Sequence, residues 1–272
     1  MAPQTSSSQE VKALPVTHPE NFPVASWLCP SHLRPAIAAI YAFARAADDI
    51  ADEGNLDAEE RRTQLQTFCQ ALRRHPSLSD FHPEIFEPLH QVIQKYKLPI
   101  DHLENLLSAF EQDVVASAQA IRPTSIEALM LYCQRSANPV GRLLLHLYGV
   151  TDEQALKRSD AICSALQLIN FWQDLSEDIP RGRFYVPQNL EASMDKAALI
   201  QQLCQHAQSL MRFGAPLVHQ VPGRAGLELR GVVQGGLRVL EKVQELGPRA
   251  FNERPTLKLW DAPLILWRCL WM

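Results

Sequence analysis

The sequence lacks the patterns that mark several common classes of protein. Its 272 residues carry a formal net charge of −4 with a pI near 6.1, which gives no basic footprint for nucleic acid. It contains no glycine-rich phosphate loop and no dinucleotide fingerprint, so we expect no nicotinamide cofactor. None of its histidines forms a motif with a serine or cysteine nucleophile. These absences argue against nucleic-acid binding, nicotinamide-dependent redox chemistry and triad-type hydrolysis.

The cysteines are scattered and form no CxxC pair, a spacing that favours reduced core thiols over disulfides or a zinc site. We therefore expect a cytoplasmic protein. The first dozen residues have no apolar stretch of the kind found in signal peptides, so residues 1–16 are expected to form a disordered tail.

Helical periodicity dominates the rest of the chain, and no sustained two-residue alternation indicates a sheet. Residues 17–255 contain no linker after residue 30 and are predicted to form one all-α domain. Pro139 should break the predicted helix 124–149 near Asn138. Helix-starting capping boxes are expected at Asp57, Asp101, Thr124 and Thr151. The expected helices cover 31–53, 57–75, 84–97, 100–120, 124–149, 151–178, 194–221 and 224–247.

Two acidic motifs are the most informative feature of the chain. Asp48 and Asp52 are four residues apart, as are Asp174 and Asp178, so on a helix each pair of carboxylates lies on one face. Like charges at this spacing repel by roughly 0.2–0.5 kcal/mol on an exposed helix. Either the pairs are well hydrated on an acidic surface, or a cation compensates them.

The neighbouring residues favour the second alternative. Tyr41 and Arg45 extend the first acidic line, while Gln167 and Asn170 extend the second, all at helical spacing and among apolar residues. Polar lines on otherwise apolar helices usually face an internal cavity. Carboxylate and amide oxygens suit Mg²⁺, which shares its coordination between a few carboxylates and substrate phosphates. The sequence therefore predicts two facing helices that hold a diphosphate through Mg²⁺.

The flanks of these motifs resemble those of the head-to-head prenyl synthases, the family that includes squalene, phytoene and dehydrosqualene synthases. The resemblance spans roughly residues 18 to 250. It is carried by Tyr41-Ala42-Phe43-Ala44-Arg45, Gln167-Leu168-Ile169-Asn170 and Arg181-Gly182-Arg183-Phe184-Tyr185-Val186-Pro187. Within the family the chain is most similar to the hydroxysqualene synthases of bacterial hopanoid synthesis, through His18-Pro19-Glu20-Asn21-Phe22, Ser136-Ala137-Asn138-Pro139-Val140-Gly141 and Asn170-Phe171-Trp172-Gln173-Asp174.

The resemblance implies the isoprenoid-synthase fold, a helical bundle with a central cavity, and assigns roles to individual residues. Mg²⁺ is the implied cofactor. Its expected ligands are Asp48, Asp52, Asn170, Asp174 and Asp178, and the expected catalytic residues are Tyr41 and these four aspartates. The expected substrate-binding residues are His18, Asn21, Phe22, Tyr41, Arg45, Ala137, Asn138, Val140, Gln167 and Arg183.

Two departures from the family pattern bear on the substrate. Relatives that join two farnesyl diphosphates often carry cations where this chain has Glu20 and Gln173. Fewer cations imply fewer phosphates. The implied reaction is therefore Mg²⁺-dependent conversion of presqualene diphosphate to hydroxysqualene with release of diphosphate. The alternative is condensation of two farnesyl diphosphates to presqualene diphosphate or squalene. A prenyl diphosphate is the expected substrate, and other squalene-pathway enzymes upstream and downstream are the candidate protein partners.

The apolar C-terminal segment, residues 256–272, is rich in tryptophan but too short to span a bilayer. Two interpretations remain open from the sequence. The segment is either a last helix docked on the core, or an interfacial anchor that makes peripheral contact with the inner face of the membrane.

Overall fold

The structure, a computed structural model, describes residues 28–74 and 80–272, and all regular secondary structure in these ranges is helical. This confirms the predicted all-α class. The α-helices are α1 (Arg34–Asp52), α2 (Ala58–Leu72), α3 (Pro83–Tyr96), α4 (Ile100–Gln119), α5 (Ile126–Ser136), α6 (Asn138–Leu147), α7 (Glu153–Gln173), α8 (Leu175–Asp178), α9 (Gln188–Ser193), α10 (Lys196–Gly214), α11 (Ala225–Leu246) and α12 (Ala262–Leu270). Short 3₁₀ turns are η2 (Ile179–Arg181), η3 (Ala215–His219), η4 (Gly247–Phe251) and η5 (Leu259–Asp261).

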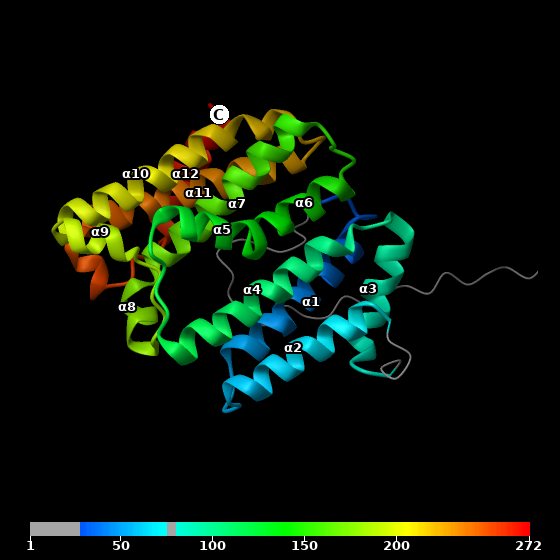
Figure 1. The fold of residues 1–272 in the computed structure, drawn as a ribbon. Helices are drawn as coiled ribbons and strands as arrows, with labels where there is room; N and C mark the ends of the chain where they lie inside the picture. Colours follow the sequence, from blue (N-terminus) through cyan, green and yellow to red (C-terminus); the bar gives the residue numbers. More distant parts are fainter. Residues whose placement is uncertain (1–27, 75–79) are drawn as a thin grey trace, which may run out of the picture.

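The helices pack around two hydrophobic clusters. One cluster joins the apolar faces of α1, α2, α3 and α4, with Phe43, Phe68 and Phe86 in mutual ring contact at its centre. The other joins α5, α7, α10 and α11 around Trp172, which has no exposed surface. Figure 1 shows α1 to α4 on one side of the molecule and α7, α10 and α11 on the other, with α5 and α6 between them. The two acidic motifs therefore belong to different halves of the packing.

Some helix starts follow local side-chain capping chemistry. Asp57 begins α2 with the complete capping box that the sequence predicts, because Glu60 also accepts from the Asp57 backbone N–H. Two other expected caps are shifted by one residue and one is absent. Ser125 and Asp152 cap α5 and α7 one residue after the predicted positions, and α4 begins after Pro99 without a side-chain cap. Each shifted cap is a neighbouring residue that can accept the same backbone hydrogen bonds.

The predicted break at Pro139 is present. α5 ends at Ser136 and α6 begins at Asn138, with Ala137 between them outside the helical region at φ −121° and ψ −48°. Gly141 then lets α6 approach α7 closely, since a Cβ at this position would lie 2.3 Å from Ser159 Oγ. The break and the glycine together turn the chain and press α6 onto α7.

The sequence predicted one helix over 151–178, and this prediction is wrong at the second acidic motif, which does not lie on one continuous helix. α7 ends at Gln173, and Asp174 lies between α7 and α8 with φ −100° and ψ 11°. The backbone still turns in the helical direction, because the Asp174 N–H donates to Asn170 and the Asp178 N–H donates to Asp174. The break therefore reorients Asp174 without separating it from Asp178.

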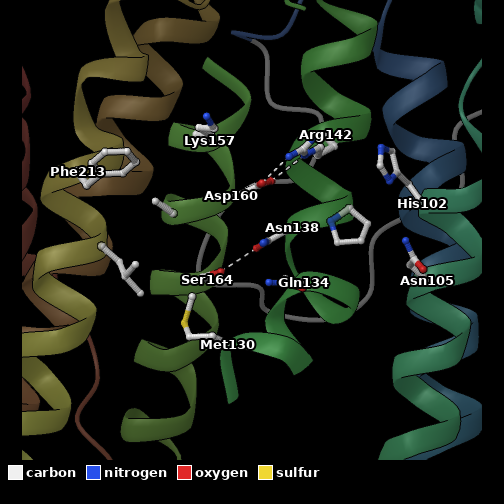
Figure 2. A pocket seen from close by; sticks show the side chains of 13 residues that line it. His102, Asn105, Met130, Gln134, Asn138, Arg142, Lys157, Asp160, Ser164 and Phe213 are labelled. Carbon is white, nitrogen blue, oxygen red and sulfur yellow. Dashed lines mark hydrogen bonds and ion pairs between the residues drawn. The ribbon is translucent and has the colours of Figure 1, made fainter. Parts of the chain in front are cut away.

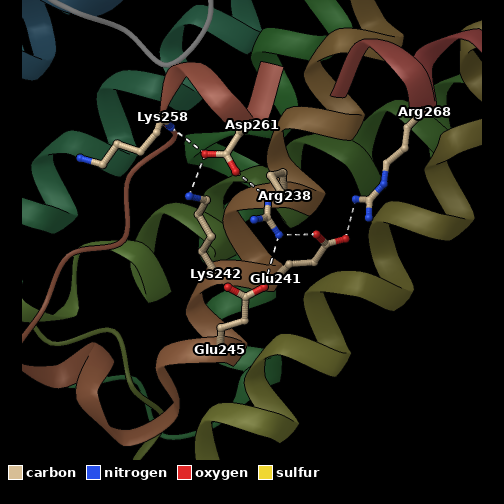
Figure 3. A network of polar contacts seen from close by, with 7 residues as sticks. All are labelled: Arg238, Glu241, Lys242, Glu245, Lys258, Asp261 and Arg268. Atoms are coloured by element: carbon tan, nitrogen blue, oxygen red, sulfur yellow. Dashed lines mark hydrogen bonds and ion pairs between the residues drawn. The ribbon is translucent and has the colours of Figure 1, made fainter. Parts of the chain in front are cut away.

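The C-terminal segment packs on the body through a buried ionic cluster (Figure 3). Asp261 is 2% exposed and accepts from Arg238 Nε at 2.8 Å, from Lys242 Nζ at 2.7 Å and from the Lys258 backbone N–H at 2.7 Å. Arg268 on α12 pairs with Glu241 on α11 at 2.5 Å. The segment is therefore docked on α11 of the body, as the first of the two interpretations expected. No helix in the described ranges is both long and apolar enough to cross a membrane.

Replacing Asp261 with alanine should destabilise the protein, because Arg238 and Lys242 would lose their buried counter-charge. The expected loss is about 3–5 kcal/mol in the free energy of unfolding. Glu245→Ala, at an exposed partner of Arg238, should cost no more than about 1 kcal/mol. Urea unfolding of both variants measures the difference, and equal midpoints for the two would contradict the assignment.

The effect of Asp261 should also depend on pH. Burial raises the pKa of Asp261, but hydrogen bonds from Lys242, the Lys258 N–H and Arg238 lower it to about 2. A pKa below the ordinary value means that the stabilisation is complete above that value and disappears as pH falls through the folded-state pKa. The stability difference between the wild type and Asp261→Ala should therefore shrink as pH falls from about 5 towards 2.

Candidate active site

The first acidic motif forms the C-terminal end of α1. Arg45 Nη1 lies 2.8 Å from Asp48, while Nη2 lies 2.8 Å from Asp49 and 3.2 Å from Glu53. Asp52 continues the line of Asp48 one turn further on, as the sequence predicts. Arg45 is thus already paired with two acids of its own helix and with Glu53 just beyond the helix end, while Asp52 receives a cation from another segment.

The second motif receives a cation from a distant part of the chain. Arg254 Nε lies 2.5 Å from Asp174 and 3.6 Å from Glu177. The adjacent Pro255 is held in place, because buried Gln173 donates from Nε2 to its carbonyl oxygen at 2.8 Å. Sequence reasoning missed Arg254, since no local pattern links it to a motif 80 residues earlier. Gln173 fixes the segment that carries this arginine.

Arg183 brings the two motifs together. Its Nη1 lies 3.0 Å from Asp52 and 4.0 Å from Asp178, and its side chain is only 19% exposed. The preceding turn aims it there, with Gly182 at φ 78° and the Arg183 N–H donating to the Asp178 carbonyl. This left-handed conformation is one that glycine adopts without strain. One guanidinium therefore bridges carboxylates that belong to opposite halves of the bundle.

The carboxylates around Arg183 carry more negative charge than the arginines relieve. Burial, followed by repulsion from Asp52, raises the pKa of Asp48 to about 7 although Arg45 opposes the shift. Burial and repulsion from Asp174 likewise raise the pKa of Asp178 to about 6. Burial also raises the pKa of Asp52, against the pull of Arg183. A further cation at this place would favour the charged form of all three groups.

These residues fit a Mg²⁺-diphosphate complex by the chemistry of their donors. In the described part of the chain no three acidic, histidine or cysteine side chains converge tightly enough to hold a metal on their own. Mg²⁺ does not require such a cage in phosphate sites, because one or two carboxylates per ion suffice and phosphate oxygens and water complete the shell. Arg183 already places a positive charge between Asp52 and Asp178. The arrangement therefore suits ions shared with a phosphate ligand.

A buried acid on α4 also faces this site, and sequence reasoning missed it. Asp113 accepts a hydrogen bond from Tyr132 Oη at 2.6 Å, and burial raises its pKa to about 7. Repulsion from Asp52 and Asp48 raises it further, which places Asp113 near the first motif. The sequence holds one signal for it, because Asp113 follows buried Ala109 at i+4. An acid on the apolar stripe of a helix requires a partner or a function.

Aromatic rings lie next to these acids. Tyr185 stacks on Phe171 with ring centroids 3.7 Å apart and an interplanar angle of 9°. Tyr132 contacts the same phenylalanine at 6.0 Å. Burial raises the pKa of Tyr185, and repulsion from Asp113 and Asp178 adds to the shift. The acidic end of the site is therefore bordered by an aromatic group made of Tyr132, Phe171 and Tyr185.

The helix break places its residues in different surroundings. Ala137 is buried, Val140 is 37% exposed, and the buried Asn138 side chain contacts the Ser164 hydroxyl at 2.8 Å. Asn138 lines an open pocket of about 580 Å³ together with residues of α4, α5, α7 and α10 (Figure 2). Neither acidic motif contributes to this pocket. Its best-defined polar feature is the Arg142–Asp160 ion pair, at 2.9 and 2.6 Å.

The remaining predicted residues are placed as follows. Tyr41 and Gln167 are partly buried on α1 and α7, each on the helix that carries the adjacent motif. Asn170 lies on α7 one turn before Asp174 and is exposed. His18, Asn21 and Phe22 lie outside the described residues. The metal-binding and substrate-binding roles of all these residues stay predictions.

Comparison with known proteins assigns the chain to a family. The family model described as squalene/phytoene synthase matches residues 16–261. A hydroxysqualene synthase of Rhodopseudomonas palustris is 31% identical, over 93% of this chain and 88% of its own length. A presqualene diphosphate synthase of the same organism is 30% identical, over 74% of this chain and 70% of its own.

The fold agrees with a solved structure. The crystal structure of squalene synthase HpnC from Alicyclobacillus acidocaldarius superposes with a TM-score of 0.73 at 32% identity, over 82% of this chain and 87% of that one. The family model, the sequence relatives and the shared fold lead to one conclusion: the chain is an enzyme of the squalene/phytoene synthase family.

Proposed function

We propose that this enzyme converts presqualene diphosphate to hydroxysqualene and releases diphosphate, in a reaction that depends on Mg²⁺. The observation that carries the proposal is the pair of acidic motifs on opposite halves of the bundle, bridged by Arg183. Similarity to a hydroxysqualene synthase along 93% of the chain supports the choice of reaction. The substrate is a prenyl diphosphate, which supplies the phosphate oxygens that such a site needs.

The charged end of the site would bind and orient the diphosphate. Asp48, Asp52, Asn170, Asp174 and Asp178 would hold Mg²⁺, which when bound supplies positive charge to the leaving group. The guanidinium groups of the site suit phosphate oxygens, which they can bind through paired N–H donors. Binding there fixes the leaving group at the end of the site bordered by the acids.

The aromatic group would receive the hydrocarbon end. When the carbon–oxygen bond breaks, the electron pair leaves with diphosphate and a carbocation remains. The faces of Phe171 and Tyr185 can stabilise such a cation, and their apolar surroundings limit its exposure to water. The cyclopropylcarbinyl cation rearranges with opening of its three-membered ring. Water then adds its oxygen to the rearranged cation and loses a proton, which gives hydroxysqualene. No nucleophilic side chain is required, because catalysis rests on charge stabilisation and control of water.

A second candidate is the condensation of two farnesyl diphosphates to presqualene diphosphate or squalene. Similarity to a presqualene diphosphate synthase at 30% identity favours it, and so does Arg254, which adds a guanidinium at Asp174. Gln173 argues against the condensation, since it contributes no positive charge and donates a hydrogen bond to the Pro255 carbonyl. The reaction that releases a single diphosphate therefore remains our first choice.

We further propose a cytoplasmic enzyme in peripheral contact with the inner face of the membrane. Enzymes that make presqualene diphosphate and consume hydroxysqualene are the corresponding partners in the pathway. The product of either candidate reaction carries a long isoprenoid hydrocarbon portion, which suits release beside a membrane.

The two candidate reactions predict different substrate preferences. Purified enzyme with Mg²⁺ should consume presqualene diphosphate much faster than farnesyl diphosphate, and the product should be hydroxysqualene without added NADPH. Excess chelator should abolish turnover, because without Mg²⁺ the carboxylates repel the diphosphate and nothing neutralises the leaving group. Mass spectrometry of products from separate incubations measures both effects. Conversion of farnesyl diphosphate alone at a comparable rate would establish the second candidate instead.

Neutralising one acid in each motif should stop the reaction without unfolding the protein. Asp48→Asn and Asp178→Asn each remove a negative charge that repels a neighbouring carboxylate, so melting temperatures should hold or rise slightly. Turnover should fall by at least about a hundredfold, the range typical for loss of a preorganised charge.

Glu59→Gln is the matched control for this pair, since Glu59 is 79% exposed on α2 and pairs only with Arg62 among the ion pairs of the described residues. It should leave turnover unchanged. Normal turnover in either aspartate variant would rule out its proposed role, whereas a lowered melting temperature would show that its charge is structural.

A further inference from the structure

The C-terminal helix presents large apolar side chains to solvent. Leu259 and Trp260 in η5 are 92% and 74% exposed, and Leu270 and Trp271 at the end of α12 are 75% and 76% exposed. Leu266, at 65%, and Trp267, at 59%, complete the group. We call these six residues the Trp/Leu face. Residues 266, 267, 270 and 271 follow i, i+1, i+4 and i+5 positions, so they form one stripe along the helix.

Asp261 and Arg268 of the same segment point the other way. Asp261 is 2% exposed and held by Arg238 and Lys242, while Arg268 turns to Glu241 (Figure 3). A surface helix of a globular protein normally buries its apolar stripe and exposes its charges. Here the charged side is buried against α11 and the apolar side is exposed. Ion pairs therefore dock the segment together with Leu257 and Met272, which pack against the core, and the Trp/Leu face stays exposed.

The exposed side-chain charge that residues 256–272 contribute is positive, which complements an anionic lipid surface. Asp261 is the only acidic side chain in residues 256–272, and it is buried. Lys258, next to Leu259, is exposed. The face therefore offers apolar side chains and a cation but no acidic side chain from its own segment. Tryptophan is also the side chain that concentrates at the boundary between lipid headgroups and acyl chains.

We propose that the Trp/Leu face docks on the surface of a phospholipid bilayer. The nine residues of α12 are too few to span the hydrocarbon core, so the helix would lie in the interface. Exposed tryptophans and leucines beside an exposed lysine favour this occupant over a partner protein, because an interfacial helix can sink among headgroups without a complementary groove. The inference does not depend on which of the two reactions the enzyme catalyses.

Vesicle sedimentation tests the proposal with the full-length chain. Wild-type protein should sediment with phosphatidylcholine vesicles, and more strongly when phosphatidylglycerol is included. The double variant Trp267→Gln/Trp271→Gln should lose roughly tenfold or more of the bound fraction. Both tryptophans are mostly exposed, so its melting temperature should equal that of the wild type.

A pair of leucine variants controls for general loss of surface hydrophobicity. Leu266→Gln lies on the Trp/Leu face, whereas Leu131→Gln lies on α5 at a similar exposure of 61%. Only Leu266→Gln should weaken sedimentation. Equal sedimentation of wild type and double variant, or none by the wild type, would overturn the proposal. Concentration-dependent dimers that the double variant abolishes, without vesicle binding, would also overturn it and assign the face to a second copy of the chain.

Turnover measured in detergent-free solution separates this proposal from the proposed function. The double variant should keep the wild-type rate, because the Trp/Leu face lies on η5 and α12, which contribute none of the acidic or arginine residues of the site. An inactive enzyme that still binds vesicles would refute the reaction alone. An active enzyme that ignores vesicles would refute the docking surface alone.

Discussion

Repulsion between the carboxylates of two facing helical segments is the constraint on which the site depends. Helix α1 and the segment around α8 pack in separate hydrophobic clusters, so apolar packing alone does not hold their acids against each other. Arg183 supplies the attraction by lying between Asp52 and Asp178. Arg45 and Arg254 each neutralise part of one motif from its own side. The balance still leaves raised carboxylate pKa values, the condition in which a bound cation gains most.

The same region separates two kinds of environment. Charged groups collect at the ends of α1 and α7, while aromatic rings and the Tyr132–Asp113 hydrogen bond lie beside them. A diphosphate ester has the same division, with a highly charged group attached to a hydrocarbon. The site can therefore orient such a molecule before any chemistry occurs, because each end is favoured in only one place.

Local patterns in the sequence predicted the parts of the structure that depend on neighbouring residues. The capping box at Asp57, the break at Pro139 and the acidic line of α1 all arise from side chains within one or two helical turns. The resemblance to known prenyl synthases identified the family correctly. Helical periodicity wrongly predicted one helix through Asp174, where α7 has ended and α8 has not yet begun.

Other features were out of reach because they depend on residues far apart in the chain. Arg254 meets Asp174 across 80 positions, and Tyr132 meets Asp113 across 19. Helical periodicity states which side chains share a face, but not which distant segment will cover that face. The side of α12 that faces the body was also out of reach, since the apolar composition of the helix predicted burial and membrane contact equally. Ion pairs to α11 decided which side of the helix faces the body.

The buried cluster at Asp261 fixes how the whole molecule would lie on a surface. A helix held only by apolar contacts could detach and insert, with its body tumbling on a flexible tether. Release of α12 would instead expose Asp261, Arg238 and Lys242 together, at the cost of separating buried ion pairs. The helix and the body must then move as one piece. Every docked molecule would share one tilt relative to the bilayer, so whatever leaves the enzyme would leave at a constant height above the lipid.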